Sequence, residues 1–205
     1  VAQFDPAVTL VDDVPGTPAL PFDAEGTPRG RLTLVERGVT RAVPYDRRTA
    51  AVAGAASTGH AVTGHWRYGP VPLSLRLEPA DRLAGGPEVV EVPGPPADSE
   101  TAALLAGVRR GLLVTDFWYT RVLDPRSLVM TGLTRNGVWL VERGEIVSAV
   151  RDLRFTQSYP AALAPGGVLG LGGRPATRPD NWEAAWWSGP AVHLAEWNFT
   201  GGASG

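Results

Sequence analysis

Hydrophobic and polar residues alternate in several short runs, which is the pattern of half-buried β-strands. The runs at 31–43 and 137–150 each turn at a glycine, Gly38 and Gly144, and therefore predict β-hairpins. Residues 71–77 and 192–199 alternate in the same way and predict single strands. The chain is therefore expected to be mainly antiparallel β, either barrel-like or a sandwich, with one or two short helices.

Two segments predict helices. Residues 49–56 are rich in alanine, and residues 99–108 start at a potential N-cap, Ser99, with Glu100 in the first turn. The segments 87–96 and 164–179 are rich in proline and glycine and predict linkers or surface loops. The first thirty residues are typical of loops and edge segments. Because neither linker is flanked by enough chain for a second core, residues 1–205 are expected to form one domain.

The amino-acid composition excludes several classes of protein function. The chain has 205 residues, 43% of them hydrophobic, which suffices for a substantial core. Its net charge of −2 disfavours non-specific nucleic-acid binding, and no apolar run approaches the roughly 20 residues of a membrane helix. Without cysteine, the chain has no disulfides, thiol catalysis or thiolate metal ligands, and a cytoplasmic location is expected.

Histidine and carboxylate positions are the first candidates for chemistry. His60 and His65 lie five residues apart, which matches neither helical nor strand spacing of zinc ligands, so a hydrogen-bonded or half-exposed role is favoured over a metal site. The segment 57–60 contains Ser and Thr next to Gly and favours a tight turn over a nucleophile. The acidic pairs at 12–13 and at 23 and 25 favour turn capping for the same reason.

Tryptophan is concentrated near the end of the chain, at Trp182, Trp186, Trp187 and Trp197. Buried aromatic clusters anchor small cores, whereas exposed ones mark interfaces. Both interpretations remain open at this point. If the first three form an interface, their rings should be partly exposed in the isolated chain.

Several segments, in this order, resemble the C-terminal domain of the TldD/PmbA family, named as modulators of DNA gyrase and regarded as metallopeptidases. The resemblance covers nearly the whole chain. The matching segments are Phe22–Pro28, Leu34–Val39, Ser57–His60, Gly111–Thr115, Thr131–Ile146, Leu153–Gln157 and Asn198–Gly202.

The resemblance implies a mainly β C-terminal domain that follows an α/β N-terminal domain carrying the zinc motif His-Glu-x-x-x-His. This chain contains no such motif. TldD-type members have a cysteine ligand in the region that corresponds to residues 181–189, and this chain has no cysteine there. The resemblance is therefore closer to the zinc-free TldE/PmbA type. It implies no cofactor in this chain, with zinc only in a TldD-type partner.

The expected function is that of a C-terminal domain or subunit of a TldD/TldE-like peptidase system acting on unfolded peptides, non-catalytic by itself. The expected partners are a TldD-like subunit, or further copies of the chain, and an unfolded peptide; neither nucleic acid nor membrane is expected. The alternative is a stand-alone β-domain that binds or hydrolyses a small ligand through the region of His60 and His65. The candidate partner or peptide contacts are His60, Arg135, Asn136, Trp182, Trp186 and Trp187.

Overall fold

The chain divides into two compact units. The structure, a computed structural model, describes residues 1–14, 17–64, 69–79, 96–179 and 185–202. One unit comprises residues 1–2, 6–81 and 173–190, and the other comprises residues 3–5, 82–172 and 191–205. Each unit has its own sheet and its own buried residues.

The first unit contains a six-stranded sheet with the order β10-β11-β4-β1-β2-β3. The strands are β1 (Leu10–Asp12), β2 (Leu32–Glu36), β3 (Val39–Thr40), β4 (Ser74–Leu77), β10 (Ala176–Pro179) and β11 (Trp186–Gly189). Neighbours pair antiparallel except β11 and β4, which run parallel. Val11 and Val35 are buried, in β1 and β2. The centre of this sheet is therefore apolar, and Asp12 lies within it.

Helix α1 (Arg47–Ala53) follows β3 in the first unit. Its N-cap is Asp46, whose carboxylate accepts from the Thr49 N–H at 2.6 Å, while the Asp46 N–H donates to the Thr49 hydroxyl at 3.1 Å. This reciprocal capping box satisfies donors that the first turn cannot pair itself. Gly54 ends the helix in the left-handed conformation, at φ +64°.

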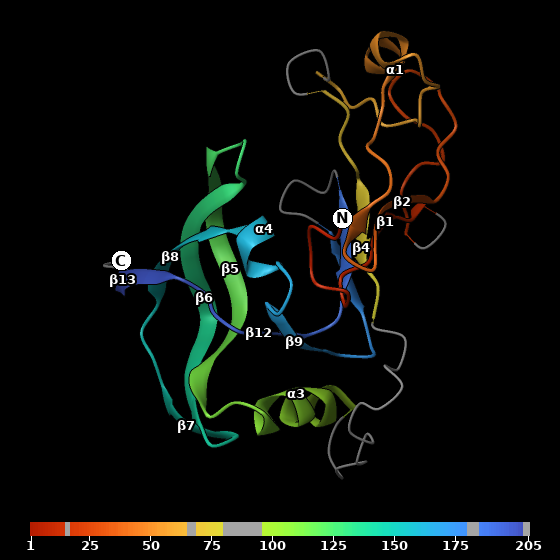
Figure 1. The fold of residues 1–205 in the computed structure, drawn as a ribbon. Helices are drawn as coiled ribbons and strands as arrows, with labels where there is room; N and C mark the ends of the chain where they lie inside the picture. Colours follow the sequence, from red (N-terminus) through yellow and green to blue (C-terminus); the bar gives the residue numbers. More distant parts are fainter. Residues whose placement is uncertain (15–16, 65–68, 80–95, 180–184, 203–205) are drawn as a thin grey trace. The chain divides into compact units, whose positions relative to one another are not determined.

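The second unit contains a five-stranded antiparallel sheet in which β13-β8-β6-β5 are neighbours and β7 pairs with β6. The strands are β5 (Arg110–Asp124), β6 (Val129–Glu142), β7 (Glu145–Ala149), β8 (Leu153–Ser158) and β13 (Phe199–Gly202). β5 and β6 form a long curved ribbon (Figure 1). The unit also contains the β-pair β9 (Val168–Leu171) and β12 (Val192–Leu194), and helices α3 (Pro96–Ala106) and α4 (Tyr159–Ala162).

Aromatic rings form the core of the second unit around Phe155, which is fully buried. Its ring centroid lies 4.8 Å from that of Phe117 and 5.5 Å from that of Trp197, and Tyr159 lies 5.7 Å from Trp197. Edge-on and offset contacts of this kind add to the free energy of apolar burial. Gly132 makes the cluster possible, because a Cβ at this position would lie 2.7 Å from Cε1 of Phe155.

The mainly antiparallel β class is confirmed, and so are both hairpins, as β2–β3 and β6–β7. The sheets of the described residues do not close into a barrel. The two helices are confirmed with shifted ends, at 47–53 and 96–106. None of the helices in the described ranges is long and apolar enough to cross a membrane.

Several local predictions were wrong. Ser99 lies inside α3 and is not its N-cap, because the helix begins at Pro96. Residues 192–199 do not form one strand: β12 pairs with β9, whereas β13 starts at Phe199 and pairs with β8. The glycine-rich segment 164–179 contains β9 and β10, and β1 lies inside its sheet and not at an edge. For the strand segments, pairing with a distant strand overrode the local signal. Most of the segment 87–96 lies outside the described residues.

Candidate functional site

The two motif segments 22–28 and 57–60 pack against each other in the first unit. Gly59 has φ +74°, and a Cβ at this position would lie 2.5 Å from the carbonyl oxygen of Pro28. Only glycine combines this backbone angle with this close approach. The predicted turn is confirmed, since the Ser57 hydroxyl donates to the Tyr45 carbonyl at 3.2 Å and accepts from the Gly59 N–H at 3.3 Å.

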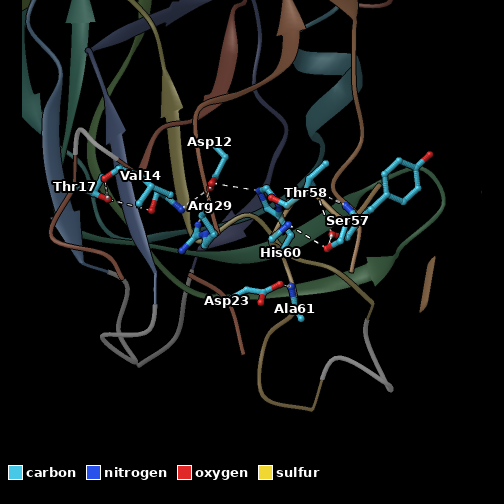
Figure 2. Close-up of polar contacts among 12 residues, drawn as sticks. Asp12, Val14, Thr17, Asp23, Arg29, Ser57, Thr58, His60 and Ala61 are labelled. Carbon is cyan, nitrogen blue, oxygen red and sulfur yellow. Dashed lines mark hydrogen bonds and ion pairs between the residues drawn. The ribbon is translucent and has the colours of Figure 1, made fainter. Parts of the chain in front are cut away.

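Asp23 fastens the first segment to the second, as Figure 2 shows. Its Oδ1 accepts from the N–H groups of Glu25 (3.0 Å) and Thr27 (2.8 Å), and its Oδ2 accepts from the N–H of Ala61 at 2.9 Å. Burial disfavours its ionisation, but these hydrogen bonds, with the charge of Arg47, hold the pKa of Asp23 below its ordinary value. Asp23 therefore caps a turn, as predicted, and also joins two distant segments.

The imidazole of His60 is enclosed, with only 1% of the residue exposed. Its Nδ1 lies 2.8 Å from both the carbonyl oxygen and the hydroxyl of Thr58, and its Nε2 lies 3.2 Å from Oδ2 of Asp12 (Figure 2). The geometry of the Nε2 contact does not meet that of a good hydrogen bond. The hydrogen-bonded role predicted for His60 is confirmed.

Asp12 is the centre of this arrangement. Its Oδ2 lies 3.0 Å from Nη2 of Arg29, and its Oδ1 accepts from the N–H of Ser74 at 2.8 Å. Both charged side chains are almost completely buried, at 0% exposure for Asp12 and 3% for Arg29. Burial raises the pKa of Asp12, but contacts with His60, the Ser74 N–H and Arg29 together leave the pKa below its ordinary value. We call Asp12, Arg29, Thr58, His60 and Ser74 the His60 cluster.

The contacts of the His60 cluster indicate a structural role, in which the cluster holds separate segments of the first unit together. Both ring nitrogens of His60 already face polar partners within the protein, so neither is directed at a reacting group in solvent. The cluster joins strands β1 and β4 to the segments around residues 29 and 58–60. Burial of a charged pair at this depth is tolerated only where partners surround both charges.

A catalytic zinc ion would need a group of ligating side chains. Within the described ranges, no three or more His, Asp or Glu side chains are grouped to hold a metal, and the sequence contains no cysteine. Zinc sites in enzymes take three protein ligands. His65, the other half of the predicted His pair, lies outside the described residues.

Arg135 and Asn136 lie on the exposed surface of β6 in the second unit. The guanidinium carbon of Arg135 lies 4.8 Å from the centroid of the Trp118 ring, a cation–π contact. Asn136 has φ +61°, and its side-chain amide donates to Asp116 at 2.9 Å across the ribbon. Both are accessible to a partner, and they belong to a different unit from His60.

Trp186 and Trp187 are adjacent on β11 in the first unit and point to opposite faces of the sheet. Trp187 is 46% exposed and Trp186 is partly buried. Partial exposure is the arrangement expected for an interface. Trp182 lies outside the described residues. Trp197 instead belongs to the aromatic core of the second unit.

Sequence reasoning did not identify Arg29 as a member of the His60 cluster, and it assigned Asp12 to a turn. A signal was present in the run Leu10-Val11-Asp12-Asp13-Val14, where acidic residues interrupt an apolar strand. A carboxylate on the inward-facing side of such a strand requires a cationic or hydrogen-bonding partner. Its partner, 17 positions away in the sequence, could not be identified from spacing.

The fold is that of a mainly antiparallel β protein. Residues 2–201 match the family PmbA/TldA metallopeptidase C-terminal domain, and the chain belongs to this family. Comparison with curated proteins gave no match.

Solved structures share the fold. They include TldE from Thermococcus kodakarensis, with 18% identity and a TM-score of 0.70. They also include two proteins named as modulators of DNA gyrase. The one from Thermotoga maritima MSB8 has 22% identity and a TM-score of 0.71, and the one from Bacteroides thetaiotaomicron VPI-5482 has 18% identity and a TM-score of 0.65. The alignments cover 98%, 97% and 98% of this chain but 41%, 40% and 38% of those chains. This chain thus spans about two fifths of the length of these relatives.

Proposed function

We propose that this chain is a non-catalytic domain or subunit of a TldD/TldE-like metallopeptidase system that acts on unfolded peptides in the cytoplasm. Family membership of residues 2–201 carries the proposal. Two observations support the non-catalytic role. The described residues contain no group of side chains that could hold a metal ion, and His60 is buried inside the His60 cluster.

Partner contact is assigned to Trp187. A large aromatic residue that is 46% exposed on a sheet gains free energy when another protein covers its remaining apolar surface. The partner is a TldD-like subunit that carries the zinc motif, with a second copy of this chain as the alternative. The exposed pair Arg135 and Asn136 provides further polar contacts in the second unit.

Peptide contact is assigned to the free side of β5. Among the described strands, β5 pairs with β6 alone, and it is 15 residues long. A strand with one open side can accept an extended peptide through backbone hydrogen bonds, which bind unfolded chains with little demand on their sequence. In this arrangement the domain forms a wall of the substrate channel.

The alternative, a ligand-binding domain that uses His60, is less well supported. A ligand could reach the buried imidazole only after the contacts with Asp12 and Thr58 were broken. Zinc-independent hydrolysis of peptides by the isolated chain would favour this alternative.

Affinity capture tests the proposal. We expect the tagged chain, incubated in native lysate, to retain a protein that sequencing shows to contain His-Glu-x-x-x-His, and the reconstituted pair to cleave an unfolded peptide in a zinc-dependent reaction. Trp187→Ala should reduce capture, whereas Val52→Ala, a change at another exposed apolar residue of the first unit, should not. Cleavage of the same peptide by the chain alone would contradict the non-catalytic role.

A further inference from the structure

The sheet of the second unit carries a hollow of about 320 Å³ on the β5–β6–β8 surface. It combines cationic, aromatic and aliphatic side chains around a glycine. Its lining consists of Tyr119, Arg121, Leu123, Thr131, Gly132, Leu133 and Arg154. We call this the arginine hollow.

Strand register places both arginines on the same face. Arg121 of β5 is opposite Thr131 of β6, and Arg154 of β8 is opposite Leu133 of β6. Thr131 and Leu133 are two residues apart on one strand and therefore share a face. Side chains that are directly opposite in an antiparallel pair also share a face, so Arg121 and Arg154 approach the hollow from its two sides.

The two guanidinium groups have no carboxylate partner within the described residues. Arg121 stacks on Tyr119, with its guanidinium carbon 4.0 Å from the ring centroid, and neither Arg121 nor Arg154 forms a salt bridge. The acidic groups of the same ribbon are engaged elsewhere: Asp116 accepts from Asn136, Asp124 accepts from Ser127, and Glu142 forms an ion pair with Arg110. Two like charges that share a hollow repel each other, and a bound anion relieves that repulsion.

The backbone at Tyr119 is strained in a way that shapes the hollow. Tyr119 has φ +55°, which is unusual for an aromatic residue, and lies in an irregular stretch of register between Trp118 and Arg121. Tyr119 as a whole is 61% exposed although its ring lies against an arginine. Strain of this kind is often located at ligand sites, where it directs a side chain that regular pairing would place elsewhere.

The geometry points to a binding site for the carboxylate of an acidic peptide side chain. Planar guanidinium groups match the two oxygens of a carboxylate, and Leu123, Leu133 and the Tyr119 ring offer apolar contacts for the aliphatic stem of a glutamate. Three of the seven lining residues, Tyr119, Arg121 and Leu123, lie on β5, whose other side is open. The assignment to a peptide rests on the function proposed above, whereas capture of a carboxylate does not.

Calorimetric titration of the whole chain tests the site. The probes are the capped peptide Ac-Ala-Leu-Glu-Leu-Ala-NH2, its Gln counterpart and free glutarate. We expect the Glu peptide to bind at least about tenfold more tightly than the Gln peptide, since hydrogen bonds to charged groups contribute this much. Arg121→Gln and Arg154→Gln should each reduce binding of the Glu peptide by about tenfold, and added salt should weaken it.

Arg151→Gln is the matched control, because it removes one exposed positive charge from the same unit outside the lining. It should leave the affinity unchanged, and circular dichroism should show all three variants folded. Equal affinity for the Glu and Gln peptides, absence of binding, or equal loss in all three variants would overturn the site. Glutarate binding as tight as that of the Glu peptide would overturn the peptide assignment. Failure to capture a zinc-motif partner would contradict the proposed function and leave the carboxylate site intact.

Discussion

The carboxylate of Asp23 accepts a hydrogen bond from the backbone N–H of Ala61 at 2.9 Å, across 38 positions of sequence. With the close approach of Gly59 to Pro28, this bond makes the two motif segments each other's packing partners. Residues that signal the family in the sequence are, in this part of the chain, determinants of the fold. Mutations there should therefore act first on stability.

Gly59→Ala should destabilise the first unit strongly. The added Cβ would meet the Pro28 carbonyl oxygen at 2.5 Å in a backbone conformation with φ +74°, so about 2–4 kcal/mol of unfolding free energy should be lost. Gly64→Ala is the control, because its φ of +77° is similar but nothing lies within 4 Å of the new Cβ. It should cost only about 1 kcal/mol. Urea denaturation measures both, and equal losses would refute the role of the close approach.

Arg29→Met should leave the Asp12 carboxylate buried without its cation. Breaking one side of a buried pair costs about 3–5 kcal/mol, so the midpoint of chemical denaturation should fall markedly. The comparison is Arg41→Met, which removes an exposed pair with Glu36 and should cost about 0–1 kcal/mol. A loss for Arg29→Met as small as that for Arg41→Met would show that the buried contact contributes little.

Acid should destabilise the first unit through Asp12 and Asp23. Both pKa values lie below the ordinary 3.8 in the folded chain, so the unfolded chain binds protons more readily. Their contribution to stability is thus fully present above pH 3.8 and is lost as pH falls through the lower folded values. Denaturation at a series of pH values should show a shallower acid decline for Asp23→Asn. An identical decline in the variant would exclude Asp23 as a contributor.

Phe155→Ala should disrupt the second unit and report on it by fluorescence. The ring is fully buried against Phe117 and Trp197, and its removal should cost about 3–5 kcal/mol. Since Trp197 loses a packing neighbour, acrylamide quenching of tryptophan emission should increase. Phe22→Ala, at a residue that is 49% exposed, should change the free energy of unfolding by no more than about 0.5 kcal/mol. Unchanged stability in the Phe155 variant would contradict the central place of this ring.

Local sequence patterns sufficed to predict strands whose pairing partners are close in the sequence. The hairpin around Gly144 was predicted because its turn and the parts of β6 and β7 that pair with each other are contained in 14 consecutive residues, 137–150. The same method failed for residues 192–199, since the break between β12 and β13 depends on which distant strand each one pairs with. It also missed the arginine hollow, because Arg121 and Arg154 come together only through the register of β6 between their strands.

The parallel pairing of Trp187 with Leu75 has a consequence for how the protein is made. Chains emerge from the ribosome N-terminus first at about 5–20 residues per second, so β4 is exposed for on the order of ten seconds before β11 is synthesised. Residues 82–172, which form most of the second unit, are translated in that interval. At the end of that interval the nascent first unit still lacks β10 and β11, and the second unit still lacks β12, β13 and Trp197. A ribosome stalled after residue 172 would present β4 with one side open to wrong partners.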